Sequence, residues 1–235
     1  MAFKFKQFEI NDSKTAMKVG TDGTLVGAWA DVSSVVNVLD IGAGCGLISL
    51  MIAQRTMDEC MIDAVEIDNG ACCDCKSNFE KSPWKERLSL ISGNFNNIKC
   101  GNYDLIISNP PFFKNDLKSP QKGRALARQG GELNYFSLIE FSASHLNNQG
   151  RLVFISDTKS ESEIEICALM NNFSISRKCY VKNTLSSAPK RVLWEMSKRK
   201  RDDEQPSKQV LPIINQDGDF SKEYKELTKD FYLKF

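Results

Sequence analysis

The chain has 235 residues, of which 41% are hydrophobic and 26% charged, and this composition predicts a single domain over residues 1–235 with one sizeable core. Its 31 lysines and arginines nearly balance 30 aspartates and glutamates, so the net charge of +1 gives no indication of a polyanion partner, and any nucleic-acid surface must come from the placement of charges. No run of about 18 apolar residues and no signal-peptide core is present, so we expect a cytoplasmic protein rather than a secreted or membrane-spanning one.

The first half of the chain alternates strand-like and helix-like segments. Strands are predicted at residues 35–40, 61–67, 88–91, 103–108 and 152–156. Helices are predicted at 47–55, directly after a glycine-rich loop at 41–46, and at 69–81 and 135–147. Such alternation is typical of an α/β fold. We therefore expect a Rossmann-like, mostly parallel, twisted sheet with helices on both faces.

The pattern changes after residue 156. Residues 174–181 and 191–197 read as consecutive strands without a helix between them, which predicts a C-terminal antiparallel hairpin. Residues 198–219 begin with four basic residues followed by three acidic ones and are predicted to be a flexible linker. Residues 220–235 regain amphipathic spacing, which indicates a short helix and a tail.

Eight cysteines in a chain of this size are expected to be reduced thiols. Cys72, Cys73 and Cys75 lie close together, but no second Cys/His pair follows them at ligand spacing. We therefore predict no metal site.

A glycine loop follows the first long strand. Gly42, Gly44 and Gly46 are spaced two residues apart between a strand and a helix, where missing Cβ atoms let the backbone approach a ligand. The spacing differs from the G-x-G-x-x-G of dinucleotide-binding proteins, and Asp40 precedes it. Glu66, 20 residues beyond the last glycine, ends the next strand, where a carboxylate can accept hydrogen bonds from ribose hydroxyls.

Together these five residues resemble the S-adenosyl-L-methionine site of class I methyltransferases. The resemblance implies a class I methyltransferase fold with S-adenosyl-L-methionine as cofactor. In that family a residue after the third strand holds the cofactor's adenine, and Asn94 and Phe95 stand at the matching place.

The tetrad Asn109, Pro110, Pro111 and Phe112 follows the strand at 103–108, where open α/β sheets bind ligands. The Asn109 side chain and the Pro110 carbonyl can both accept hydrogen bonds from one amino group. Phe112 could stack on a planar substrate. The tetrad resembles that of amino-methyltransferases, which act on exocyclic base amines or on a glutamine amide.

A longer resemblance covers nearly the whole chain. MKVGTDG at 17–23, LDIGAGCGLISLMIAQR at 39–55, VEID at 65–68, NPPFF at 109–113 and DFYLKF at 230–235 look like the bacterial tRNA(Val) adenine-N6 methyltransferase family. The resemblance implies methylation of the exocyclic N6 amine of adenine 37 in the anticodon loop. It also implies that Lys18, Thr21 and Asp22, within an N-terminal extension spanning 1–34, lie near the cofactor, and that Asn109 contacts it.

Local charge supports an RNA partner. The range 177–201 contains nine basic residues and a single acidic one, Glu195. The range 114–128 contains five basic residues and a single acidic one. The residues predicted to contact RNA are Lys114, Lys118, Lys122, Arg124, Arg128, Lys190 and Arg191. We expect a monomer or weak oligomer, with a tRNA anticodon loop as substrate and no membrane partner.

Three alternatives stay open. Ribosomal-RNA guanine-N2 methylation and protein glutamine-N5 methylation would both suit the tetrad. A non-catalytic RNA-binding scaffold could retain the fold without the chemistry.

Overall fold

The computed structural model describes residues 2–98, 101–111, 133–198 and 205–235. Its strands are β1 (Phe3–Lys4), β2 (Glu9–Ile10), β3 (Asn37–Ile41), β4 (Met61–Glu66), β5 (Leu88–Ser92), β6 (Tyr103–Ser108), β7 (Leu146–Asp157), β8 (Ser174–Lys182), β9 (Pro189–Ser197) and β10 (Ser207–Pro212). Its helices are α1 (Thr21–Trp29), α2 (Leu47–Arg55), α3 (Asn69–Lys81), α5 (Tyr135–His145), α6 (Glu161–Met170) and α7 (Lys222–Thr228), with 3-10 turns η1 (Lys85–Arg87), η2 (Phe95–Asn97) and η3 (Thr158–Ser160).

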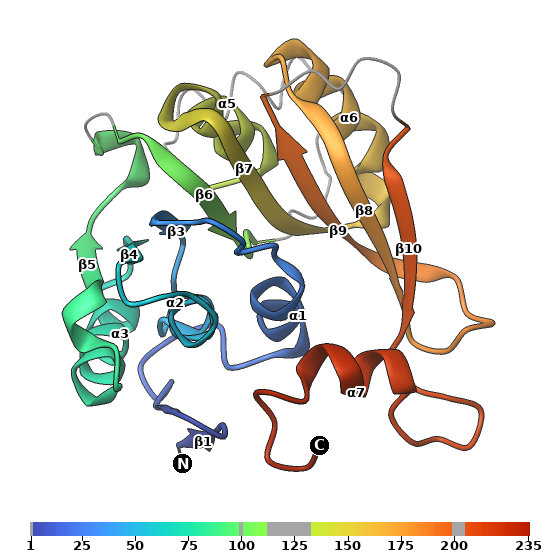
Figure 1. The fold of residues 1–235 in the computed structure, drawn as a ribbon, viewed down its shortest axis with the longest axis horizontal. Helices are drawn as coiled ribbons and strands as arrows, with labels where there is room; N and C mark the ends of the chain where they lie inside the picture. Colours follow the sequence, from blue (N-terminus) through green and yellow to red (C-terminus); the bar gives the residue numbers. More distant parts are fainter. Residues whose placement is uncertain (1, 99–100, 112–132, 199–204) are drawn as a thin grey trace.

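One large sheet organises the described residues, with strands in the order β10-β8-β9-β7-β6-β3-β4-β5 (Figure 1). The strands from β7 to β5 pair in parallel, and β10 is parallel to β8. Only β9 in this sheet runs against both of its neighbours. β3, β4 and β6 therefore all end at one edge, which we call the C-terminal edge.

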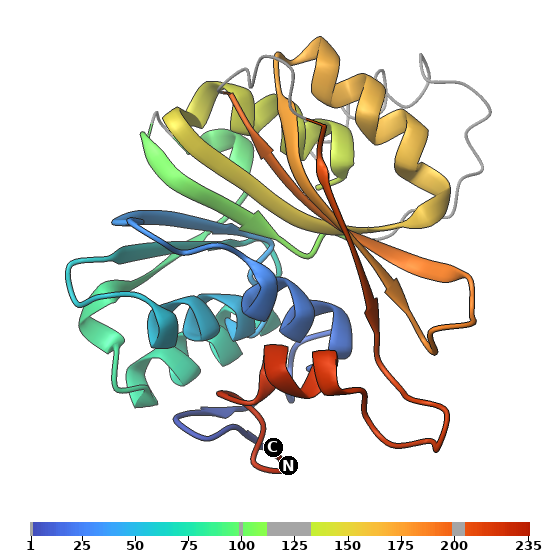
Figure 2. The same ribbon diagram turned by 45° about the vertical axis from the view of Figure 1, so that its right-hand side comes forward.

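Helices cover both faces of the sheet. Figure 2 shows α1, α2, α3 and α7 on one face and α5 and α6 on the other. This arrangement confirms the expected Rossmann-like fold, and the β8–β9 pair confirms the C-terminal antiparallel hairpin. In the described ranges, no helix combines the length and the apolar character needed to cross a bilayer.

Two helices were not predicted from the sequence. In α1, Gly23 and Gly27 lower the helix propensity, and residues 23–29 are all buried, so the helix lacks an amphipathic period. Its stability comes from packing against α2. The second, α6, fills the connection between β7 and β8 and buries only Ile164, Cys167 and Ala168.

The predicted linker at 198–219 contains a strand. Ser207–Pro212 form β10, which pairs with β8 over six residues, from Ser207 opposite Arg177 to Pro212 opposite Lys182. Backbone hydrogen bonds define this edge strand, because Val210 is exposed and only its last two residues are buried. The hydrophobic pattern of residues 207–212 is therefore too weak to predict the strand that their backbone forms.

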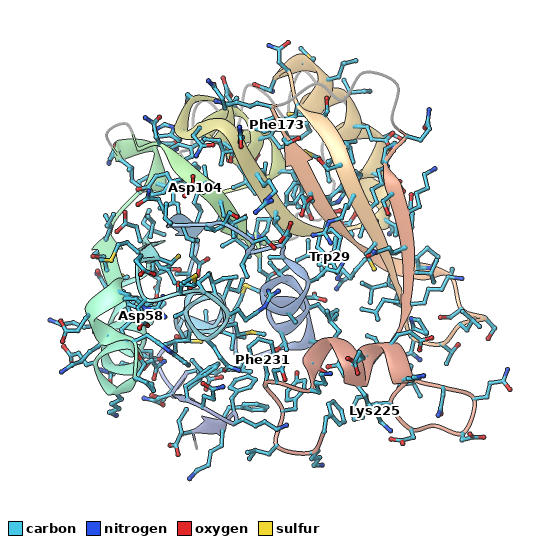
Figure 3. All side chains as sticks on the ribbon, viewed as in Figure 1. Trp29, Asp58, Asp104, Phe173, Lys225 and Phe231 are labelled. Carbon is cyan, nitrogen blue, oxygen red and sulfur yellow. The ribbon has the colours of Figure 1, made fainter. Side chains whose placement is uncertain are left out.

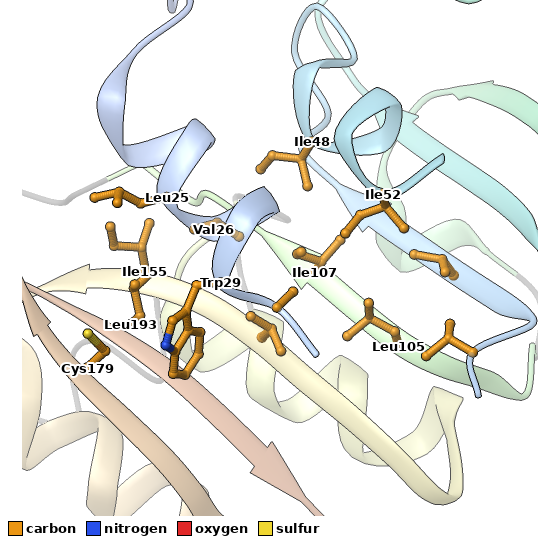
Figure 4. Packing of buried hydrophobic residues seen from close by; sticks show 14 of the residues in the cluster. Leu25, Val26, Trp29, Ile48, Ile52, Leu105, Ile107, Ile155, Cys179 and Leu193 are labelled. Atoms are coloured by element: carbon orange, nitrogen blue, oxygen red, sulfur yellow. The ribbon is translucent and has the colours of Figure 1, made fainter. Parts of the chain in front are cut away.

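The core beneath α1 and α2 joins both helices to the sheet. Leu25 and Val26 of α1 lie with Ile155 and Leu193 of the sheet, while Ile52 of α2 belongs to the same buried cluster (Figure 4). These five side chains have no exposed surface. Burial of this apolar area holds both helices against the same face of the sheet.

The two ends of the chain lie side by side (Figures 1 and 2). Phe5 stacks on Phe8 and on Tyr232, with ring centroids 4.7 and 5.7 Å apart. The Lys6 backbone N–H donates to the Phe231 carbonyl at 2.8 Å. The N-terminal segment is therefore attached to the segment after α7, far from it in sequence.

We predict that Leu25→Ala lowers the free energy of unfolding by about 2 to 5 kcal/mol, because it removes buried contacts and leaves a cavity. Leu185→Ala is the control, since Leu185 is largely exposed and its loss should cost less than about 0.5 kcal/mol. Urea unfolding of both variants measures the difference. Equal losses would contradict a packing role for α1.

Candidate cofactor and substrate site

A cavity of about 900 Å³ lies at the C-terminal edge. Its walls come from the glycine loop after β3, the end of β4, the segment after β5 and the residues after β6. Residues 15–23, which lead into α1, form a further continuous wall. Segments distant in sequence meet here because parallel strands end at the same edge.

The glycine loop has a backbone that side chains would strain. Gly42 and Gly46 have φ of +70° and +84°, in the left-handed region that favours glycine. A Cβ at Gly46 would lie 2.6 Å from the Phe79 ring, and one at Gly42 would lie 2.6 Å from Leu133. Both positions therefore require glycine for conformation, and Gly46 also requires it for space.

Glu66 is held by three backbone donors. Its Oε2 accepts from the Gly44 N–H at 2.8 Å, and its Oε1 accepts from the N–H groups of Ile67 and Asp68, each at 2.8 Å. The carboxylate therefore joins the glycine loop to the end of β4. Carboxylate oxygens have further lone pairs, so Glu66, which lines the cavity, can still accept from a ligand.

Asp40 lies behind the glycine loop rather than among the residues that line the cavity. Its Oδ2 accepts from the Ser49 backbone N–H at 3.0 Å and from the Ser49 hydroxyl at 2.6 Å. Ser49 is in the first turn of α2, whose N-cap Gly46 has no side chain, so Asp40 satisfies a donor that a capping residue would otherwise satisfy. Complete burial raises the pKa of Asp40 to about 7, and the Glu66 carboxylate adds to this rise.

Three predicted cofactor residues belong to the wall at 15–23. The Lys18 ammonium donates to the backbone carbonyls of Asp12, Ser13 and Thr15, so it closes this segment on itself. Thr21 begins α1 and lines the cavity. Asp22 also lines the cavity, and its Oδ2 accepts from Arg191 Nε at 3.0 Å.

Asn94 and Phe95 line the cavity on the side of β5. The Asn94 side chain accepts from the Asn96 N–H at 2.9 Å and so caps η2. The Phe95 ring is buried and contacts Phe141 edge-on, with centroids 5.3 Å apart. Phe95 therefore belongs to the core as well as to the cavity wall.

Asn109 and Pro111 line the cavity directly after β6. Asn109 Oδ1 is buried and has no hydrogen-bond partner within the described part of the chain. The preceding residue, Ser108, donates its hydroxyl to the Ile41 carbonyl at 2.7 Å, which fixes the end of β6 to the end of β3. Pro110 is buried and Pro111 is exposed. An acceptor without a donor in a cavity is a site for a ligand N–H or O–H.

The other predicted substrate residues divide into two groups. Phe112, Lys114, Lys118, Lys122, Arg124 and Arg128 lie outside the described residues. Lys190 is exposed at the start of β9, and Arg191 beside it pairs with Asp22 on the cavity wall.

Part of the basic stretch after residue 177 is buried, contrary to its predicted role as an RNA surface. Arg177 pairs with the buried Glu195 and lies 4.2 Å from the centre of the Trp29 ring. Lys178 is buried between two carboxylates, those of Glu161 and Glu165. Both cations are paired within the fold, because a desolvated cation requires a partner, and a count of charges along the sequence does not detect this pairing.

Asp68 and Leu133 also line the cavity, and neither was predicted as a site residue from the sequence. The signal for Asp68 was present, because an acid before a helix-like segment predicts an N-cap, and its side chain accepts from the Ala71 N–H. Leu133 is a single apolar residue before a helix and gives no such signal.

The cysteines are free thiols at the seven positions described, and only Cys73 is exposed. Burial raises the pKa of Cys45, which lines the cavity, to about 12. Among the residues described, no three His, Cys, Asp or Glu side chains are grouped to hold a metal ion.

Comparisons with known proteins give a consistent match. The model of the methyltransferase small domain family matches residues 24–180. A tRNA1(Val) (adenine(37)-N6)-methyltransferase from Trichodesmium erythraeum is 39% identical over 237 residues, which cover 99% of this chain and 98% of that protein. Proteins of the same name from Tolumonas auensis and Bacteroides thetaiotaomicron are each 36% identical, covering 99% and 98% of this chain and 97% of each relative.

Solved structures share the fold at lower identity. A predicted O-methyltransferase from Agrobacterium tumefaciens has a TM-score of 0.67 at 14% identity and covers 89% of this chain and 96% of its own. The ribosomal protein L11 methylase from Lactobacillus delbrueckii has a TM-score of 0.58 at 18% identity and covers 80% of this chain and 84% of its own.

We predict that Asp40 makes stability depend on pH. Its folded pKa of about 7 lies above the ordinary value of 3.8, so the folded state binds more protons than the unfolded state between these values. Stability contributed by this group therefore falls as the pH rises from about 4 to 7, by an amount on the order of a few kcal/mol.

The substitution Asp40→Asn removes this titration while its side-chain oxygen can still accept from Ser49. Urea unfolding at several pH values should show the variant gaining stability relative to the wild type as the pH rises. Parallel stability curves for the two proteins would contradict the raised pKa.

Proposed function

We propose a function from one premise: the chain belongs to the methyltransferase small domain family and to the tRNA1(Val) (adenine(37)-N6)-methyltransferases. It is an enzyme that transfers a methyl group from S-adenosyl-L-methionine to the exocyclic N6 amine of adenine 37 in tRNA(Val). Because its substrate is a tRNA, we also propose a cytoplasmic location.

The observation that carries this proposal is the buried Oδ1 of Asn109, which has no hydrogen-bond partner among the residues that the structure describes. A buried amide oxygen without a donor costs free energy, and a bound amino group would remove that cost. Asn109 lies in the same cavity as the glycine loop and Glu66, so a substrate amine at Asn109 would be next to a ligand at the loop.

The residues of the cavity suit the cofactor. Its volume, about 900 Å³, is in the range of small-molecule sites. The glycine loop lets a ligand approach the backbone closely, and Glu66 offers a fixed acceptor for ribose hydroxyls. Asn94, which lines the cavity, would contact the adenine. S-adenosyl-L-methionine supplies an electrophilic methyl group on a sulfonium.

The chemistry needs an oriented amine more than a strong base. The nitrogen lone pair of an exocyclic amine is spread into the ring, so the amine is a poor nucleophile. Asn109 Oδ1 and the Pro110 carbonyl would both accept from its two hydrogens and hold it pyramidal for in-line attack. The two prolines after Asn109 restrict the backbone that carries these acceptors.

RNA would approach along the C-terminal edge. Lys190 is exposed there, and Arg191 next to it is joined to the cavity through Asp22. Cations contact phosphates without reading sequence, so these residues would orient the anticodon loop. A base in a single-stranded loop can leave its stack at lower cost than a base in a duplex, which suits a buried target site.

We predict that Asn109→Ala lowers kcat about 100-fold or more and leaves cofactor affinity nearly unchanged, because it removes an acceptor used in the transition state. Steady-state kinetics with tRNA and calorimetric titration with S-adenosylhomocysteine measure the two quantities. Retained turnover would refute the role of Asn109.

The reaction itself is tested with labelled S-adenosyl-L-methionine and unmodified bulk tRNA, followed by nucleoside mass spectrometry. We expect N6-methyladenosine. N2-methylguanosine would instead support guanine-N2 methylation, and label only in protein would support glutamine methylation. Absence of both transfer and cofactor binding would support a non-catalytic scaffold.

A further inference from the structure

Residues 11–19, which we call the strap, pass over the N-terminal half of α3 before forming one wall of the cavity. Asp74 of α3 is 2% exposed, and its Oδ2 accepts three hydrogen bonds from the strap. The donors are the backbone N–H of Lys14 at 2.7 Å and the backbone N–H and hydroxyl of Thr15, both at 2.9 Å. This carboxylate therefore fixes the point at which the strap reaches the cavity.

Asn78, one turn further along α3, connects the start of the strap to the glycine loop. Its amide is paired with the Asn11 backbone in both directions, accepting at 2.9 Å and donating at 2.8 Å. The same nitrogen donates to the Cys45 carbonyl of the glycine loop at 2.8 Å. Asn78 is 2% exposed, so these bonds form away from solvent.

The strap also lies very close to the start of α3. A Cβ at Gly70 would be 2.8 Å from the Lys14 carbonyl oxygen, which no real Cβ tolerates. Gly70 has helical backbone, so this position requires a small residue only because the strap passes there.

None of Gly70, Asp74 and Asn78 lines the cavity, so none can touch a ligand inside it. Thr15, in contrast, does line it, and its methyl carbon is 3.7 Å from the Cβ position of Gly44. Any effect of Asp74 and Asn78 on a ligand must therefore pass through the strap or the glycine loop. A Cβ at Gly70 would also lie 3.2 Å from Asp68 Oδ1, and Asp68 lines the cavity.

We propose that Asp74 and Asn78 are positioning residues that set cofactor affinity by holding the strap in place as a wall of the cavity, with Gly70 providing the space for it. This inference rests on the proposed cofactor, S-adenosyl-L-methionine. When the strap occupies its position for only a fraction of the time, the dissociation constant rises by the inverse of that fraction.

The test uses the full-length chain and calorimetric titration with S-adenosylhomocysteine. Gly70→Ala displaces the strap and keeps every anchor side chain, and alanine is the better helix former, so α3 is retained. Asp74→Ala removes the anchor itself. We expect both variants to raise Kd about tenfold or more, as for a strap in place about a tenth of the time.

Asp74→Asn keeps an oxygen that can accept from the strap and should restore Kd to within about threefold of the wild type. Asp104→Ala is the matched control. Asp104 Oδ2 also accepts two successive backbone N–H groups, from Val36 and Asn37, each at 2.9 Å, but it lies at the start of β6, away from the C-terminal edge (Figure 3). The Kd of the Asp104→Ala variant for S-adenosylhomocysteine should stay within about twofold of the wild-type value.

Steady-state kinetics give a second readout. Gly70→Ala should raise the KM for S-adenosyl-L-methionine and leave kcat at saturation nearly unchanged, since no group at the reacting atoms is altered. Unchanged Kd in both Gly70→Ala and Asp74→Ala would overturn the proposal, as would an equal loss in Asp104→Ala. If S-adenosylhomocysteine does not bind the wild-type chain, the proposed cofactor is refuted. That result differs from the two outcomes above, in which the wild-type chain binds and only the comparison with the variants fails.

Discussion

Parallel pairing of β3, β4 and β6 is the constraint on which the site depends, because it brings three chain segments to one edge of the sheet. The glycine loop follows β3, Glu66 ends β4 and Asn109 follows β6. Two hydrogen bonds then tie the strand ends together, from Gly44 to Glu66 and from Ser108 to Ile41. The cavity is thus a product of strand register, and its acceptors are fixed before any ligand binds.

Around this edge, carboxylates repeatedly organise backbone by accepting N–H groups. Glu66 fixes the glycine loop, Asp40 satisfies the first turn of α2, and Asp74 anchors the strap. Loops cannot satisfy their donors through a regular ladder, so buried acceptors from neighbouring elements take that place. Asn109 is the complementary case, because its Oδ1 has no donor among the described residues and is the acceptor that we propose for a substrate amine.

Sequence patterns predicted the parts of the fold with strong local periodicity, including α3 and β6 at the bounds observed, and the strand ends that meet at the cavity. The cavity wall at 15–23 was expected only from the family resemblance. They could not predict α1, whose burial on all sides removes the amphipathic signal, or β10, which is defined by backbone pairing. Individual side-chain roles were harder still. Lys18 was assigned to the cofactor from resemblance, yet its ammonium is bound to strap carbonyls, and Asp74 carried no signal because its partners lie about 60 residues away.

The most direct measurement compares methyl transfer to two tRNA(Val) transcripts that differ only at position 37, one with adenine and one with guanine. If Asn109 Oδ1 and the Pro110 carbonyl accept from adenine N6, we expect one methyl group on the adenine transcript and none on the guanine transcript. Equal transfer to both would place the methylated base elsewhere, and transfer only to the guanine transcript would contradict adenine as the substrate.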